Sequence, residues 1–359
     1  MVRFFGKAIL RIMVLISQLG ILAVGGLGLL VLVISHWPMR ISPLFDLNFV
    51  LVPWVLMALL PTILMAFLLR RRYLRWLLLS LTLVLGAPYA RFFLPHAAPI
   101  SPIGYPLRVM TFNTWGVKRP NDVEQIAALI YFQHPDVLLL QEVSAARLDR
   151  LMNRLNALYP NRKLSVAVNP ETDQVTISRF PLTITGIDSS ATQLLQTQVQ
   201  TPAGPIEVWN VHAYRENFLA AFSERNVLSY STLADHRDGI EQFEWLNRRI
   251  GQMPMQQPLI VAGDFNVTPF SPEYTLMTEH TKDAFAEAGW GFGFTFPATR
   301  GQMLTGTLRG RKIRVSSPGP VAQLDHVFHS GRVLAINTYV VSTSAGSDHR
   351  PVVSDFVLN

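Results

Sequence analysis

Acidic, amide and imidazole side chains recur between residues 113 and 349. They are Asn113, Glu142, His212, the Gly263-Asp264-Phe265-Asn266 run, the Asp325-His326 pair and the Ser347-Asp348-His349-Arg350-Pro351 run. Carboxylate and amide oxygens are ligands that hard divalent cations prefer, and histidine exchanges protons near neutral pH. A phosphodiester is anionic and repels nucleophiles, so its hydrolysis needs neutralised charge, an activated water and a proton for the leaving oxygen. Each motif alone is weak, but the ordered series predicts a metal-dependent phosphoesterase site.

The segments around these motifs predict layered α/β structure, because short apolar runs alternate with helical periodicity from Leu107 onward. We predict strands at 107–112, 137–140, 164–168, 175–178, 182–187, 206–212, 258–262, 324–328 and 351–357, and helices at 123–132 and 236–250. The motif residues fall at strand ends, where loops converge beyond a rigid scaffold.

The order of the motifs resembles the endonuclease/exonuclease/phosphatase superfamily. This is the deoxyribonuclease I-like group that also includes neutral sphingomyelinases and inositol polyphosphate phosphatases. The resemblance spans residues 107–359, which we expect to form the catalytic domain. It implies a four-layer α/β sandwich, in which two packed mixed β-sheets are flanked by helices. The alternation of strands and helices alone predicts only the α/β class.

The resemblance also implies a metal centre and a set of roles. Mg²⁺, with Mn²⁺ as the alternative, would be held by Glu142 as the main ligand, by Asn113 as its neutral companion and by Asp348 through water. Glu142 taken alone is equally typical of a solvated residue at a strand end. The metal assignment therefore depends on the other motifs.

Five further residues receive catalytic roles from the resemblance. Asp264 and Asn266 would position the attacking water and the phosphate while Phe265 packs behind them, although Gly-Asp-x-Asn is also good turn chemistry. His349 would be the general base, oriented by Asp325. His212 would protonate or hydrogen-bond the leaving oxygen. The remaining histidines are expected to be interfacial, on the surface or structural: His36, His96, His134, His236, His280, His326 and His329.

The predicted substrate is a phosphoester other than damaged DNA. Apurinic endonucleases of the superfamily have Trp-Asn-x-Asn-Gly after the first strand and Gln-Glu-Thr-Lys at the glutamate. This chain instead has Phe112-Asn113-Thr114-Trp115-Gly116 and Gln141-Glu142-Val143-Ser144. A nuclease normally offers a basic track to many phosphates. The predicted catalytic domain has one basic cluster, Arg309, Arg311, Lys312 and Arg314, and we predict that Arg311 and Arg314 bind a headgroup or second phosphate. An exposed charged hairpin is an equal alternative.

The N-terminal part of the chain contains three apolar stretches. We predict that 12–34, 49–69 and 76–93 are transmembrane helices of a membrane anchor at 1–95, because about 20 apolar residues cross the bilayer core. For the first stretch the alternative is a cleaved signal, whose apolar region is typically only about 7–15 residues long. For the third, Pro88 and Arg91 leave a shortened or re-entrant segment as the alternative.

Charge predicts how the anchor is oriented. Residues 1–106 carry nine basic residues and one acid, so the chain's net charge of +7 leaves about −1 for residues 107–359. Basic residues are retained on the cytoplasmic side, and here they precede the first stretch and fill the turn after the second: Arg3, Lys7, Arg11, Arg70, Arg71, Arg72 and Arg75. We therefore expect a multi-pass protein of the cell (inner) membrane with an extracytoplasmic catalytic domain. Residues 96–106 would be a stiff Pro-rich linker, and the absence of cysteine is compatible with export.

Aromatic residues near the motifs leave a choice open. Trp290, Phe292, Phe294 and Phe296 alternate at strand spacing, and 218–230 is an additional apolar segment. Core packing is the default for them, and a membrane-facing lip is the alternative.

The predicted function is a phosphodiester hydrolase tethered to the bilayer that acts on a lipid-linked or membrane-proximal phosphoester. An exported nuclease acting on nucleic acid and an inactive membrane scaffold are the alternatives. The sequence specifies no oligomeric state.

Overall fold

Two units make up the protein, Met1–Leu94 and Pro95–Asn359, and each is described by itself. The structure is a computed structural model. It describes residues 18, 20, 22–30, 33, 42–94, 103–114, 122–189, 193–213, 230–308, 311–317 and 319–359.

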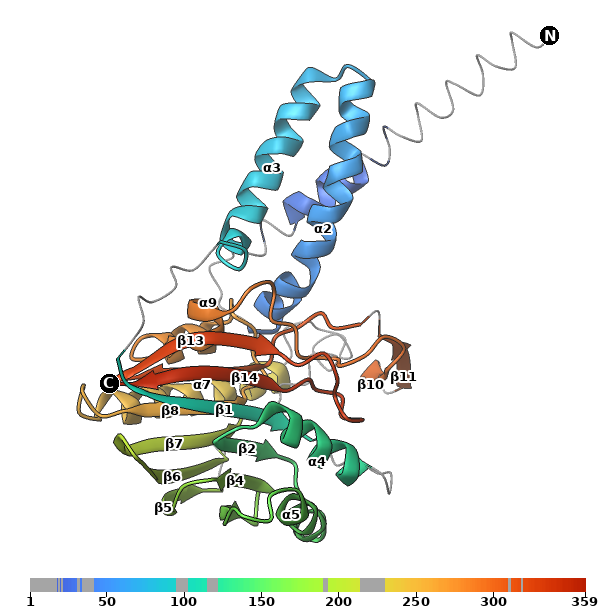
Figure 1. The fold of residues 1–359 in the computed structure, drawn as a ribbon. Helices are drawn as coiled ribbons and strands as arrows, with labels where there is room; N and C mark the ends of the chain where they lie inside the picture. Colours follow the sequence, from blue (N-terminus) through green and yellow to red (C-terminus); the bar gives the residue numbers. More distant parts are fainter. Residues whose placement is uncertain are drawn as a thin grey trace, which may run out of the picture. The chain divides into compact units, whose positions relative to one another are not determined.

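The N-terminal unit contains an antiparallel pair of long helices, α2 (Ser42–Leu68) and α3 (Arg72–Ala90) (Figure 1). The pair is closed by a tight turn in which Arg70 has a φ of 54°, and Arg75 lies over the Phe67 ring at 4.8 Å. Large apolar side chains cover the outside of both helices, including Leu64 at 61%, Trp76 at 71% and Leu83 at 71% exposure. An outer surface of this kind suits hydrocarbon better than water.

Two candidate membrane spans are found among the described residues, Leu51–Leu68 and Arg72–Ala90, in place of the three expected. About half of the predicted span at 12–34 lies outside the described residues, and 22–30 is helical. The span predicted at 76–93 begins earlier, at Arg72, because Arg72 and Arg75 already belong to the helix. It continues through Pro88 and ends at Ala90.

Two mixed six-stranded sheets form the framework of the second unit in the described part of the chain. The first sheet has the order β13-β14-β1-β2-β4-β3. Its strands are β1 (Tyr105–Asn113), β2 (Val137–Gln141), β3 (Ser165–Asn169), β4 (Gln174–Ser178), β13 (Val333–Val340) and β14 (Val352–Leu358). Its parallel pair is β1 with β2, and the other neighbours are antiparallel.

The second sheet has the order β5-β6-β7-β8-β12-β9, with β7 and β8 as its parallel pair. Its strands are β5 (Leu182–Asp188), β6 (Leu194–Thr201), β7 (Gly204–His212), β8 (Leu259–Asp264), β9 (Lys282–Asp283) and β12 (Asp325–Ser330). A separate hairpin of β10 (Met303–Leu308) and β11 (Arg311–Ser316) precedes β12.

Helices cover the outer faces of both sheets, so the unit has four layers (Figure 1). α4 (Asp122–Gln133) and α5 (Ala145–Leu158) pack on the first sheet, through side chains such as Ile126 and Leu151. α7 (Tyr230–Gly251) and α8 (Pro272–Thr278) pack on the second, through Phe243 and Met277. The predicted arrangement of two packed mixed sheets flanked by helices is therefore confirmed.

The central core lies between the sheets and follows from the alternation of side chains along each strand. In β1, Leu107 and Val109 point to the second sheet, whereas Met110 and Phe112 pack under the helices. In β8, Ile260 points inward and Val261 points outward. The inward series then runs through Thr111 to Asn113 on β1 and through Ala262 to Asp264 on β8.

One expectation about an irregular segment is wrong. Tyr105 and Pro106, assigned to the linker, belong to β1 and pair with Leu358 and Val357, because β14 extends far enough to bind them. The residues from Trp290 to Phe296, left open between core packing and a membrane-facing lip, lie outside the named strands, and among them Phe296 makes an isolated bridge with Ala322. Most of 218–230 lies outside the described residues.

Candidate active site

Polar side chains replace the apolar core at one end of the space between the sheets. The inward series on β1 ends with Asn113, that on β7 ends with His212, and that on β8 ends with Asp264. On β12, Asp325 lies opposite Asp264 in the antiparallel register. The period of two along a strand thus carries these residues to one end of the sandwich.

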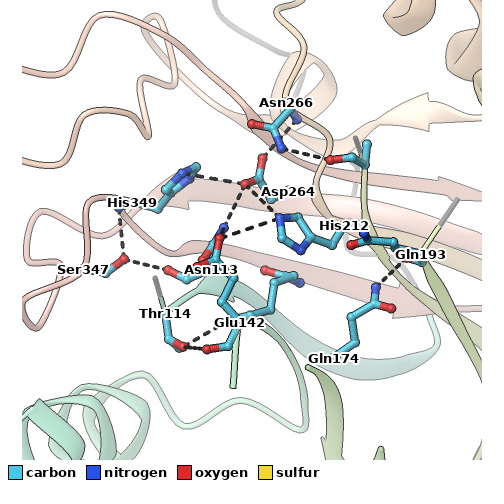
Figure 2. Close-up of polar contacts among 12 residues, drawn as sticks. Asn113, Thr114, Glu142, Gln174, Gln193, His212, Asp264, Asn266, Ser347 and His349 are labelled. Carbon is cyan, nitrogen blue, oxygen red and sulfur yellow. Dashed lines mark hydrogen bonds and ion pairs between the residues drawn. The ribbon is translucent and has the colours of Figure 1, made fainter. Parts of the chain in front are cut away.

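Asp264 lies in the centre of the group (Figure 2). The Asn113 Nδ2 atom donates to Asp264 Oδ2 at 2.9 Å and to Glu142 Oε1 at 3.1 Å. One amide thereby connects a carboxylate from each sheet. Asp264 is 1% exposed, whereas the Glu142 side chain is 34% exposed. Glu142 is therefore the member of the pair that solvent reaches more readily.

His212 faces the same two carboxylates. Its Nε2 atom lies 3.8 Å from Glu142 Oε1 and 4.0 Å from Asp264 Oδ2, and its side chain is 18% exposed. These distances are longer than hydrogen bonds. The ring is held near the acidic group while leaving room for another polar atom.

His349 and Asp325 form a buried pair on the other side of Asp264. Asp325 Oδ2 lies 2.8 Å from His349 Nδ1, and His349 Nε2 lies 3.7 Å from Asp264 Oδ2. The Phe296 ring packs against the imidazole, with centroids 5.0 Å apart. Because Nδ1 is engaged by Asp325, Nε2 is the nitrogen directed at the acidic group.

The charges within this group shift three pKa values. Burial by itself lowers the pKa of His349, but attraction to Asp325 and Asp264 outweighs burial and raises it to about 10. Burial also raises the pKa of Asp325, against the attraction of His349. Burial favours a raised pKa for Asp264 as well, yet His349, His212 and the Asn113 hydrogen bond hold that pKa below its usual value. The arrangement stabilises an imidazolium between two carboxylates.

Glu142 is presented by a strained backbone. Its φ of 59° lies in the left-handed region, which is uncommon for a residue other than glycine. The Arg147 Nη1 atom donates to the Glu142 carbonyl oxygen at 3.0 Å, and Thr114 Oγ1 donates to the same oxygen at 3.2 Å. Arg147 is 6% exposed, and burial lowers its pKa. This buried guanidinium on α5 holds the turn that directs Glu142.

Asn266 has the second strained backbone of the site, with a φ of 52°. Its backbone N–H donates to Asp264 Oδ1 at 3.0 Å, and its Nδ2 donates to the Ala213 carbonyl at 3.0 Å. The turn predicted as an alternative is therefore present, and the Asn266 amide lies beside Asp264 (Figure 2). Phe265 is fully buried behind them, as expected.

Residues outside the predicted set also build the site. The Ser347 hydroxyl donates to the Asn113 carbonyl at 2.7 Å and accepts from the His349 N–H at 3.1 Å, so it connects the His349 backbone to β1. The Gln141 Nε2 atom donates to Asn210 Oδ1 at 2.8 Å, which links the two sheets beneath the site. Reading β7 with a period of two would have placed Asn210 beside His212, whereas nothing in the sequence indicates Arg147.

Gly263 explains part of the Gly-Asp-x-Asn motif. A Cβ atom at this position would lie 1.8 Å from the Val211 carbonyl oxygen. Any side chain there would push β7 and β8 apart. The glycine therefore allows His212 and Asp264, which are paired in the parallel register, to end side by side.

The other predicted residues are placed as follows. Asp348 is 6% exposed, and its backbone carbonyl accepts from Ala298 N at 2.7 Å. Arg311 and Arg314 lie on β11 of the hairpin, where Arg314 is exposed. Arg309 lies outside the described residues. The phosphate-binding role of Arg311 and Arg314 stays a prediction.

The donor set fits a divalent cation. Among the described residues, one set of three ionisable side chains has ligand atoms within 4.8 Å of one another, and it comprises Asp264, Asp325 and His349. This buried acidic cluster can hold a metal ion. The more exposed Glu142, joined to it through Asn113, adds a further hard oxygen donor. The excess of carboxylates over cationic groups is the feature that a divalent ion would balance.

Comparisons with known proteins agree with this geometry. The sequence profile of the Endonuclease/Exonuclease/phosphatase family matches residues 110–349. The chain belongs to this family of hydrolases that act on phosphoester bonds. No curated protein sequence gives a significant match.

Solved structures resemble the fold of this chain over about 70% of its length. An endonuclease/exonuclease/phosphatase family protein from Bacteroides thetaiotaomicron superposes with a TM-score of 0.50 at 13% identity, over 72% of this chain and 100% of that one. A mannosyl-6-phosphatase from the same organism gives 0.50 at 14% identity, over 70% and 100%. An endonuclease/exonuclease/phosphatase from Beutenbergia cavernae is 22% identical, with a TM-score of 0.48, over 71% and 72%. At such identities the likeness concerns the fold alone.

Proposed function

We propose that the protein is a metal-dependent phosphodiester hydrolase, tethered to a membrane, that acts on a lipid-linked or membrane-proximal phosphoester. The observation that carries this proposal is the Asp325–His349 pair, whose Nε2 atom faces Asp264 beside the Asn113–Glu142 pair. A base, an acidic metal-binding group and a second imidazole thus share one end of the sandwich. A single phosphate bound there would contact all three.

Each residue of the site has a separate role in hydrolysis. His349 Nε2 accepts the proton of the attacking water as the oxygen bonds to phosphorus, and Asp325 keeps the ring in the orientation that exposes Nε2. The bond from phosphorus to the leaving oxygen breaks, and His212 donates a proton to that oxygen. The Asn113 and Asn266 amides can donate to phosphate oxygens without adding charge. Asp264 aligns the water with the phosphorus.

Glu142 is the main metal ligand in this proposal, with Asn113 beside it and Asp348 acting through water. The ion is Mg²⁺ or Mn²⁺, and when bound it neutralises the phosphate. The ion would also change the pKa of His349. Without it, the pKa of about 10 keeps the ring protonated at neutral pH, so the ring cannot accept a proton. A nearby positive charge favours the neutral ring. His349 can therefore accept a proton only when a bound cation offsets the negative charge of the carboxylates.

The membrane anchor limits the class of substrate. Two apolar helices of the chain are long enough to cross a bilayer, and the arginines at 70, 71, 72 and 75 mark the end that stays in the cytoplasm. With the predicted span at 12–34, the catalytic unit would lie outside the cytoplasm at the inner membrane. The near-neutral catalytic unit favours a lipid-linked phosphoester over nucleic acid.

A purified full chain in detergent tests the proposal. The substrates are bis(p-nitrophenyl) phosphate, a phospholipid in mixed micelles and supercoiled plasmid, each with Mg²⁺, with Mn²⁺ and with EDTA. We expect metal-dependent hydrolysis that His349→Ala lowers about 10²- to 10⁴-fold and that His280→Ala, a change at an exposed histidine, leaves intact. Equal activity of the His349→Ala protein would overturn the mechanism. Plasmid nicking without phospholipid hydrolysis would show a nuclease instead.

A further inference from the structure

The chain makes an excursion between α9 (Ala284–Ala288) and β12 that begins with aromatic residues. We call Trp290, Phe292, Phe294 and Phe296 the aromatic strip. The Phe292 and Phe294 rings stack in parallel, with centroids 4.9 Å apart and planes at 6°. Trp290 is 71% exposed at the outer end of the strip, whereas Phe296 packs against His349 at the inner end. The strip therefore extends from solvent to the catalytic base.

The inner end of the strip is fixed to the catalytic loops. Thr295 Oγ1 accepts from the Asp325 N–H at 3.3 Å, and the Thr295 carbonyl accepts from the Arg350 N–H at 2.9 Å. A third bond, at 2.7 Å, joins the Ala298 N–H to the Asp348 carbonyl. Because these bonds connect the segment of the strip to Asp325 and to the two neighbours of His349 in the chain, its position relative to the base is set by the fold.

The composition of the strip indicates what it binds. Phe292, Phe294 and Phe296 are only partly buried, and glycines at 291 and 293 separate the rings with φ values of +87° and +63°. Exposed aromatic surface beside a polar site commonly marks a ligand-binding region. A nucleobase would stack on such rings too, but nucleic acid also requires a basic track for its backbone. Residues 107–359 have a net charge of about −1, as counted from the sequence.

We propose that the aromatic strip binds the hydrocarbon chain of an amphiphilic phosphoester while its phosphate lies beside His349. The inference rests on the proposed function, because it assigns the apolar part of the substrate to a surface continuous with that site. The two apolar helices of the same chain supply the second reason for choosing hydrocarbon, since they would keep the enzyme in a lipid environment. The strip thus selects substrates by chain length.

A series of soluble diesters isolates this selection. Methyl, octyl and dodecyl p-nitrophenyl phosphate share one scissile bond, and each releases p-nitrophenolate, so only the hydrocarbon varies. With wild type we expect kcat/KM to rise from the methyl to the dodecyl ester. Trp290→Ala and Phe294→Ala should each lower the dodecyl-to-methyl ratio about tenfold, mainly through KM, because each removes apolar contact area.

A matched control and three outcomes decide the inference. Phe132→Ala removes an aromatic side chain of 74% exposure from α4, which packs on the first sheet, and it should leave the ratio unchanged. An unchanged ratio in both strip variants, with His349-dependent hydrolysis of the methyl ester intact, would overturn this inference and spare the proposed function. A wild type that hydrolyses no diester would overturn both. Strip variants that weaken cleavage of a single-stranded oligonucleotide, with the ratio unchanged, would assign the strip to nucleobases.

Discussion

The site has an open half and a buried half, and the two differ in what they offer. In the open half, Glu142 is 34% exposed on a strained turn and touches Asn113. In the buried half, Asp325 and His349 are 0% and 3% exposed and are joined by a 2.8 Å hydrogen bond. A hydrated cation and an anionic substrate can reach the first half. The buried half suits proton transfer, because the local dielectric constant is low there and the geometry of the Asp325–His349 hydrogen bond is fixed.

Asp264 connects the two halves and is close to both. The Asn113 amide attaches it to Glu142, and its Oδ2 atom lies 3.7 Å from His349 Nε2. The difference between the halves predicts that metal binding and proton transfer can be lost separately by mutation. Four changes test this division.

The largest effect is expected in the buried half. His349→Ala removes the proposed general base, and we expect kcat to fall about 10²- to 10⁴-fold, the usual contribution of general base catalysis. Initial rates on bis(p-nitrophenyl) phosphate with saturating Mg²⁺ measure it. Binding of Mn²⁺ should persist in this variant, and its loss would show that the imidazole is a metal ligand.

The next effect belongs to the open half. Glu142→Gln removes the charged oxygen donor while keeping the side chain's size, and we expect Mn²⁺ affinity to fall at least about tenfold by isothermal titration calorimetry. Asp325→Asn is the comparison, since it also replaces one carboxylate by an amide but does so in the buried half. If Asp325→Asn weakened Mn²⁺ more than Glu142→Gln, the division of the site would be wrong.

A smaller effect should follow from the support of the open half. Arg147→Met keeps an unbranched side chain but removes the Nη1 contacts with both Thr114 Oγ1 and the Glu142 carbonyl. We expect Mn²⁺ affinity to fall roughly tenfold, as is common for residues that orient a metal ligand, with kcat at saturating metal little changed. Arg150→Ala, an exposed neighbour on α5, should change neither quantity.

The smallest effect is the pH dependence of the buried half. The pKa of His349 is raised from 6.5 to about 10, so the protonated ring stabilises the folded metal-free protein fully below about pH 6.5. This stabilisation is lost as pH rises through about 10. We expect the Tm in EDTA to fall by several degrees from pH 7 to pH 10, and by less in His349→Ala. Parallel curves for the two proteins would count against an imidazolium between carboxylates.

Much of this architecture could be predicted from the sequence because it depends on local periodicity. Inward positions two apart along β7 and β8 carry His212 and Asp264 to the end of the sandwich, so motif residues near strand ends predict a shared site. Arg147 could not be found in this way, since its contact with the Glu142 carbonyl depends on how α5 packs on the first sheet. The sequence left the aromatic strip open between core packing and a membrane-facing lip, because the alternation of rings and glycines does not indicate which elements pack against the rings.

The position of the metal ion tests the central claim most directly. A crystal soaked in Mn²⁺ and measured at the manganese absorption edge would locate the ion by its anomalous scattering. We predict an ion bound to a carboxylate oxygen of Glu142, with the Asp325–His349 hydrogen bond intact. An ion bound among Asp264, Asp325 and His349, with Glu142 uninvolved, would contradict the account.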